Sequence, residues 1–213
     1  MEVLHEDKCV KYELFNISAI DDVAITIAGV FSQSEPMAVT RGVSQDEIAN
    51  LIKPLGFKVA QESLTIVAKS KEADELIGVL LCDDFAAATV EDAPVPSKKL
   101  APILTLLDEL DSRYKQGNLS LNEYLHLSLL AVKPQHRGKK IAQNLVQVSL
   151  ENGIRKGYQK TVTTATGVIS QHIFRQFGFV ERIKIPYRTF RYQDEQVFVS
   201  LEESIILMDK NLT

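Results

Sequence analysis

The fold is decided by one stretch, Leu129-Leu130-Ala131-Val132-Lys133-Pro134-Gln135-His136-Arg137-Gly138-Lys139-Lys140-Ile141-Ala142. A buried apolar strand runs into a basic turn, and a helix opens directly after it. Such a turn directs several free backbone N–H groups at one point, with the positive end of the helix dipole behind them. Gly138 lets a ligand approach the backbone closely. The stretch predicts a pyrophosphate site, with an ordinary strand-to-helix turn bearing a solvated basic face as the alternative.

On both sides of this turn, strand and helix patterns alternate over the rest of the chain. A capping box at Ser44-Gln45-Asp46-Glu47 opens a helix that Pro54 and Gly56 should break. The patterns predict strands at 10–17, 64–68, 76–82, 124–132, 159–164, 179–190 and 196–207. They predict helices at 21–31, 44–59, 100–110, 139–156 and 168–177, and a long loop at 83–98. The order is that of a mixed α/β sheet.

Length and composition favour a single globular domain spanning 1–213. The chain has 213 residues, 45% hydrophobic and 24% charged, with a net charge of −4 that argues against a nucleic-acid binder. No apolar run is long enough for a bilayer, and the N-terminus resembles neither a signal nor a transit peptide. Cys9 and Cys82 are too few for a disulfide framework, so we expect reduced thiols and a cytoplasmic protein. We expect no metal and no membrane partner.

The turn resembles motif A of the GNAT acetyltransferases, whose core is Q/R-x-x-G-x-G/A. Five residues match the family pattern and its context, namely Gln135, Arg137, Gly138, Ile141 and Ala142. Lys140 departs from it, because the family has a small residue there. A second element, Ser170-Gln171-His172-Ile173-Phe174-Arg175-Gln176-Phe177-Gly178-Phe179, resembles the motif B helix.

The resemblance implies the GNAT acyl-CoA N-acyltransferase fold, a mixed and mostly antiparallel sheet with splayed central strands flanked by helices. It implies acetyl-CoA as co-substrate and a small-molecule amine as acceptor, in a monomer or homodimer. The cofactor-binding residues that it implies are Leu130, Ala131, Val132, Arg137, Gly138, Lys139, Lys140, Ile141, Ala142, Ser170 and Phe174.

Three further stretches resemble the insect-type arylalkylamine N-acetyltransferases. They are Phe31-Ser32-Gln33-Ser34-Glu35-Pro36-Met37, the segment from Ser170 to Phe174, and Ile185-Pro186-Tyr187 followed by Val197-Phe198. In that branch the glutamate of the first motif is the general base, so the resemblance assigns this role to Glu35. The alternative for Glu35 is an exposed carboxylate at a helix end.

Proton transfer has other candidates. An alkylammonium has a pKa near ~10, so a proton must leave before the nitrogen attacks. His126 is the rival base, and strict alternation would place it on the face of Ser128, Leu130 and Val132. Many family members carry a tyrosine where Phe174 stands, so the hydroxyls of Ser170 or Thr166 could instead hydrogen-bond the leaving thiolate.

The acceptor stays open between an arylalkylamine, a polyamine and a protein amine, and a CoA-binding module without turnover is the alternative from another class. Tyr187, Phe190 and Tyr192 could line an acceptor pocket or belong to the core. The acidic residues of the 83–98 loop, Asp83, Asp84, Glu91 and Asp92, could attract a cation or form a solvated loop.

Overall fold

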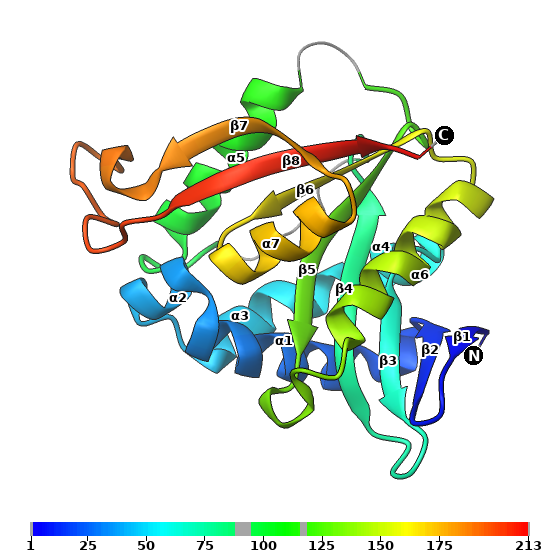
Figure 1. The fold of residues 1–213 in the computed structure, drawn as a ribbon. Coiled ribbons are helices and arrows are strands. Elements are labelled where there is room, and N and C mark those ends of the chain that lie inside the picture. Colours follow the sequence, from blue (N-terminus) through cyan, green and yellow to red (C-terminus); the bar gives the residue numbers. More distant parts are fainter. Residues whose placement is uncertain (1, 88–94, 116–118, 213) are drawn as a thin grey trace.

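A mixed sheet of eight strands organises the chain, in the order β1-β2-β3-β4-β5-β6-β8-β7 (Figure 1). This computed structural model describes residues 2–87, 95–115 and 119–212. The strands are β1 (Val3–Glu6), β2 (Val10–Leu14), β3 (Ile66–Ser70), β4 (Leu76–Asp84), β5 (Tyr124–Val132), β6 (Lys160–Ala165), β7 (Val180–Pro186) and β8 (Ser204–Asn211). The β5–β6 pair is parallel and every other neighbouring pair is antiparallel.

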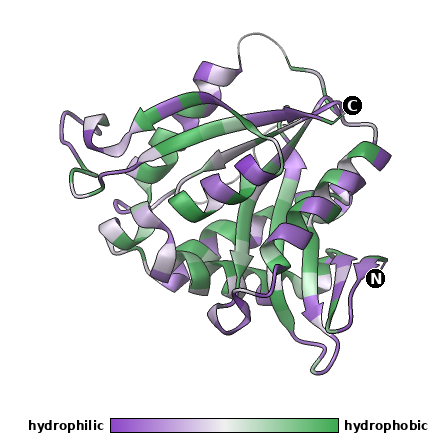
Figure 2. Ribbon diagram, in the orientation of Figure 1, coloured by the Kyte–Doolittle hydropathy of each residue, from purple (hydrophilic) through white to green (hydrophobic). Residues whose placement is uncertain are grey.

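Helices cover both faces of the sheet. One face packs against α1 (Ile20–Ser34), α2 (Pro36–Arg41), α3 (Gln45–Ile52), α4 (Gly56–Glu62) and α5 (Ala101–Tyr114). The other face packs against α6 (Ile141–Arg155) and α7 (Val168–Gln176). The buried apolar residues of these helices pack against those of the sheet, and the hydropathy colouring shows that the helices carry both apolar and polar residues (Figure 2). We call these faces the α1 face and the α6 face.

The central strands diverge, and this fork positions the site. β5 and β6 pair only from Tyr124↔Lys160 to His126↔Val162, and beyond that point they separate (Figure 1). The Thr163 hydroxyl donates a 2.8 Å hydrogen bond to the Leu127 carbonyl, which replaces a ladder bond at the fork. The backbone edge of β5 beyond the fork is therefore unpaired on its β6 side.

A β-bulge in β5 changes which side chains share a face. Leu81 pairs with Leu129 and Cys82 with Leu127, so Ser128 is an extra residue on β5. The alternation therefore shifts at the bulge. His126 lies on the α1 face, where its ring is 5.1 Å from that of Phe85, whereas Leu130 and Val132 pack on the α6 face. The prediction that His126 shares a face with them is wrong, because it assumed unbroken alternation.

The five predicted helices are present, including the break after Ile52 and the capping box at Ser44 and Glu47, but α2 was not predicted and α6 begins at Ile141 instead of Lys139. The strand predicted at 196–207 is wrong in its first half, since β8 begins only at Ser204. Phe198 is fully buried from a turn, so its apolar character reflects core packing instead of strand alternation. β1 was missed because it is a short, mostly exposed edge strand with no buried stripe.

The predicted 83–98 loop is also corrected at its start. Asp83 and Asp84 end β4 and do not belong to a loop. Asp83 is partly exposed and pairs with His126, and Asp84 is 5% exposed and accepts hydrogen bonds from the Tyr158 hydroxyl and the Asn122 backbone amide. Glu91 and Asp92 lie outside the described residues.

Candidate active site

The turn between β5 and α6 has the geometry of an anion site. Gly138 has φ +77°, and Lys140, the residue directly before α6, has φ +61°. Among the described residues, none accepts a hydrogen bond from the backbone amides of Gly138, Lys139 or Lys140. The first amides of the 15-residue α6 are also free of helical partners. All these donors lie at the positive end of the α6 dipole.

Cationic side chains surround these amides. Lys133 is held by Glu75 at 2.7 Å, and Arg137 donates a 3.2 Å hydrogen bond to the Ser34 hydroxyl at the end of α1. Lys139 and Lys140 are exposed. These two residues form a bend directly before α6 and are not helical, so the predicted helix start at Lys139 is corrected to Ile141. The left-handed backbone at Lys140 explains why the motif A pattern favours glycine there.

The open part of the fork leaves one edge of β5 unpaired. Leu129, Leu130 and Val132 stay partly exposed in the middle of the sheet, although Ala131 is buried. This partial exposure of apolar side chains follows from the absence of a β6 partner beyond His126. An extended chain with amide groups, such as pantetheine, would find unpaired backbone donors and acceptors along this edge.

Glu35 is buried between α1 and α2, where it caps α2. It is 8% exposed, and its carboxylate accepts hydrogen bonds from the amides of Met37 at 3.2 Å and Ala38 at 2.6 Å. Burial raises the pKa of Glu35 above its usual 4.5, and hydrogen bonds from these amides and from the Thr166 side chain oppose this only partly. The alternative of an exposed helix-end carboxylate is wrong.

Residues at the end of β6 meet Glu35. The Tyr187 hydroxyl donates a 2.6 Å hydrogen bond to the Thr166 carbonyl, and Tyr187 is fully buried. Burial and the charge of Glu35 raise the pKa of Tyr187, which keeps it a neutral donor. A Cβ on Gly167 would be 3.5 Å from Pro36, so the start of α7 lies against the start of α2. Ser170 donates to the Gly167 carbonyl at 2.9 Å and thereby caps its own helix.

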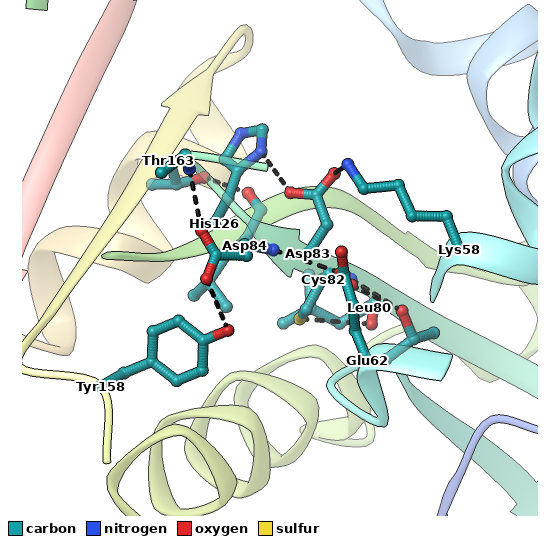
Figure 3. Close-up of polar contacts among 12 residues, drawn as sticks. Lys58, Glu62, Leu80, Cys82, Asp83, Asp84, His126, Tyr158 and Thr163 are labelled. Atoms are coloured by element: carbon teal, nitrogen blue, oxygen red, sulfur yellow. Dashed lines mark hydrogen bonds and ion pairs between the residues drawn. The ribbon is translucent and has the colours of Figure 1, made fainter. Parts of the chain in front are cut away.

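His126 belongs to a different cluster, at the closed end of the fork (Figure 3). Its Nδ1 is 2.9 Å from Asp83 Oδ1, and the two residues are cross-strand partners. Lys58 is 3.8 Å from the other oxygen of Asp83. Burial lowers the pKa of His126, but the charge and hydrogen bond of Asp83 outweigh it and raise the pKa above 6.5.

Comparisons with known proteins agree with this geometry. Residues 110–188 match the family model described as the acetyltransferase (GNAT) domain, a range that contains β5, the 133–140 turn, α6, β6 and α7. The chain carries a GNAT acetyltransferase domain. The expected family and the expected fold with splayed central strands are both confirmed.

Solved structures share the whole architecture of the chain. The C-terminal condensation domain of Ebony, in complex with β-alanyl-dopamine, is similar with a TM-score of 0.86 at 16% identity, covering 95% of this chain and 98% of that one. Arylalkylamine N-acetyltransferase 2 from Aedes aegypti is similar with a TM-score of 0.78 at 22% identity, covering 96% and 99%. A polyamine N-acetyltransferase from Drosophila melanogaster reaches 0.71 at 16%, covering 95% and 99%. At these identities the likeness establishes a common fold. No curated protein sequence matches the chain.

The site of this GNAT domain therefore has two parts, the turn with the β5 edge and the Glu35 cluster. Sequence reasoning brought Glu35, Thr166 and Ser170 to one place, and it missed Asp83 as the partner of His126. Cross-strand pairing across the bulge could have found Asp83 only with the register known. Phe174 is 2% exposed and packs edge-on against Phe179 at 5.1 Å, so it belongs to the core.

Neither cysteine forms part of the candidate site, and the described residues offer no metal site. Cys9 is free and exposed at the β1–β2 turn, and Cys82 is free and buried, with its pKa raised by burial. Within the described ranges, no group of His, Cys, Asp or Glu side chains could hold a metal ion. No helix in the same ranges is long and apolar enough to cross a membrane.

Proposed function

We propose that this chain is an acetyl-CoA-dependent N-acetyltransferase that acts on a small primary amine, with arylalkylamines as the acceptor class. The observation that carries the proposal is the meeting of a buried carboxylate, Glu35, with the open end of the β5–β6 fork through Thr166 and Tyr187. An anion-binding turn and a candidate base thus flank the open part of the fork.

The residues present fit acetyl-CoA. The unpartnered amides of Gly138, Lys139 and Lys140 would bind the pyrophosphate, with Arg137 and the exposed lysines adding charge. The edge of β5 from Leu130 to Val132 would pair with the amides of the pantetheine arm. Bound acetyl-CoA supplies an acetyl thioester, which an amine nitrogen can attack directly.

Glu35 would take the proton that the amine must lose. A general base works best when its pKa lies near the working pH, and burial moves the pKa of Glu35 in that direction. The Thr166 side chain and two backbone amides hold the carboxylate in one orientation. Ser170, at the start of α7, would offer its hydroxyl to the departing sulfur only by releasing its hydrogen bond to Gly167.

His126 is less suited to this role. Its Nδ1 is engaged by Asp83, and the residue lies at the paired end of the fork, four positions along β6 from the residue that contacts Glu35. At about 3.3 Å per residue, the backbone positions of Val162, the partner of His126, and of Thr166 are about 13 Å apart. We therefore assign the base to Glu35 and an ion-pair role to His126.

The side chains near Glu35 favour an aromatic acceptor over a polyamine. Tyr187, Phe198 and Phe190 form a row of rings whose centroids are 5.9 Å apart at each step, and Met37 is fully buried beside Glu35. A polyamine would need several carboxylates along its length, whereas the side chains of this buried row are aromatic. Tyr192 is only half-buried at a turn and takes no part in the row.

The test is release of CoA thiol with phenethylamine, tryptamine, dopamine, spermidine and lysine peptides. We expect the wild type to turn over the arylalkylamines, and Glu35→Ala to lose about 10²–10⁴-fold in kcat with acetyl-CoA affinity retained. Glu47→Ala is the matched control, because it removes another capping carboxylate, at α3. Undiminished turnover by Glu35→Ala would move the base to His126. Tight acetyl-CoA binding without turnover of any amine would indicate a non-catalytic module.

A further inference from the structure

Two threonines of β6 have buried hydroxyls without a partner. Among the described residues, none hydrogen-bonds to Thr161 Oγ1 or Thr164 Oγ1, and both atoms are inaccessible to solvent. Buried hydroxyls are nearly always hydrogen-bonded in proteins, so an exception needs an explanation. The two residues are three positions apart on one strand, but their surroundings differ.

Thr161 lies in the closed part of the sheet. It pairs with Leu125 of β5 on one side and with Lys210 of β8 on the other, and it is fully buried. No space for a ligand exists between paired strands. Its unpartnered hydroxyl is therefore a feature of the packed sheet.

Thr164 lies in the open part. It pairs with Leu207 of β8, but it stands beyond Val162, the last residue of β6 that pairs with β5. Alternation puts it on the α1 face with Val162 and Leu207, both members of the core beneath α1. Its residue surface is only partly buried, in contrast to Thr161. Thr164 therefore borders the open part of the fork, and a rotation of its side chain would bring the covered hydroxyl to a ligand bound there.

The position of Thr164 relates it to Glu35. Thr166, two residues further along, contacts Glu35 and Tyr187. Two residues of extended chain span about 6–7 Å, so Thr164 lies that far from Thr166 along the backbone. A small primary amine has N–H donors that need acceptors once it leaves water. Glu35 can accept a hydrogen bond from one of these N–H groups. A second acceptor for another N–H group would fix the direction in which the lone pair of the amine nitrogen points.

We propose that Thr164 is a positioning residue whose hydroxyl accepts a hydrogen bond from the nitrogen of the acceptor amine. This inference rests on the proposed amine acetylation. The hydroxyl gains its missing partner only when the amine is bound, so the interaction favours a bound amine over an empty fork. The class of ligand is a primary amine with an unsubstituted, compact NH₂ group.

The experiment compares Thr164→Val, Thr164→Ser and the matched control Thr161→Val. We measure KM and kcat for tryptamine, the Kd of acetyl-CoA, and the Kd of tryptamine for the CoA-loaded protein. Thr164→Val should raise both the KM and the Kd of tryptamine about tenfold or more, because one hydrogen bond to a charged or polar nitrogen is lost. The Kd of acetyl-CoA should change by less than about twofold.

Two controls separate positioning from stability. Thr164→Ser should keep the tryptamine constants within about threefold of the wild type, and Thr161→Val should leave them unchanged, although it removes the same kind of hydroxyl. Neither valine variant should lower the Tm, since each replaces an unpartnered polar group by a methyl. A merely structural Thr164 would move the Tm and spare the tryptamine constants.

The outcomes distinguish the two proposals. Wild-type turnover of arylalkylamines with unaltered tryptamine constants in Thr164→Val overturns the inference and leaves the proposed function intact. A wild type that neither acetylates nor binds any amine overturns the proposed function, and the inference with it.

Discussion

Glu35 combines two roles that pull its pKa in opposite directions. Burial raises the pKa above 4.5, and the amides that it caps lower it, with burial dominant. A base must be ionised to accept a proton, so kcat should fall as the pH drops through this raised pKa, with the inflection above 4.5. The measurement is kcat for tryptamine from about pH 4 to pH 9. Glu47→Gln should keep the same limb, and an inflection at or below 4.5 in the wild type would argue against Glu35.

Lys140 is strained where glycine would not be. A left-handed backbone costs an ordinary residue about 1–2 kcal/mol, partly offset because glycine loses more entropy on folding. Lys140→Gly should therefore raise the free energy of unfolding by up to about 1 kcal/mol, measured by urea denaturation. Lys139→Gly removes the same charge from a residue that is not left-handed, and it should destabilise. Equal effects of the two substitutions would contradict the strain at Lys140.

At the scale of elements, the cross-strand pair Asp83–His126 ties β4 to β5 at the closed end of the fork. The side chains are 21% and 19% exposed, so solvent screens the pair only partly. The pKa of His126 is raised above 6.5. Burial raises the pKa of Asp83, but the charge and hydrogen bond of His126, together with the charges of Lys58 and Lys115, outweigh it and lower the pKa below 3.8. The stabilisation that protonated His126 gives the folded protein is fully present below pH 6.5. It is lost as the pH rises through the raised pKa of His126 in the folded state.

The difference in unfolding free energy between wild type and His126→Gln should therefore shrink as the pH rises above 6.5 and through the raised pKa of His126. Urea denaturation at several pH values measures it. His172→Gln, at an exposed position of α7, is the control and should show no such pH dependence. A pH-independent difference for His126→Gln would mean that the histidine is not charged in the folded protein.

Elements with strong periodicity or caps were predictable, and features that depend on pairing were not. The capping box at Ser44 and the strand Tyr124–Val132 follow from local pattern, as does the turn around Gly138. The bulge at Ser128 was not predicted, because alternation was assumed to continue unbroken from His126 to Val132. The role of Glu35 came from resemblance, while its burial required the packing of α1 against α2.

At the scale of the whole molecule, the fork divides the sheet into β1–β5 and β6–β8, joined by three paired positions and the Thr163–Leu127 hydrogen bond. A cofactor in the open part would contact both halves, so binding should stabilise the folded state by about 2.7 kcal/mol at a hundredfold excess over Kd. Hydrogen exchange with and without CoA measures where this occurs. Protection should increase at 127–132 and 138–142 and stay constant in the β1–β2 hairpin, which lies at the far edge of the sheet. Protection confined to 138–142 would mean that the ligand binds through its phosphates alone and leaves the fork empty.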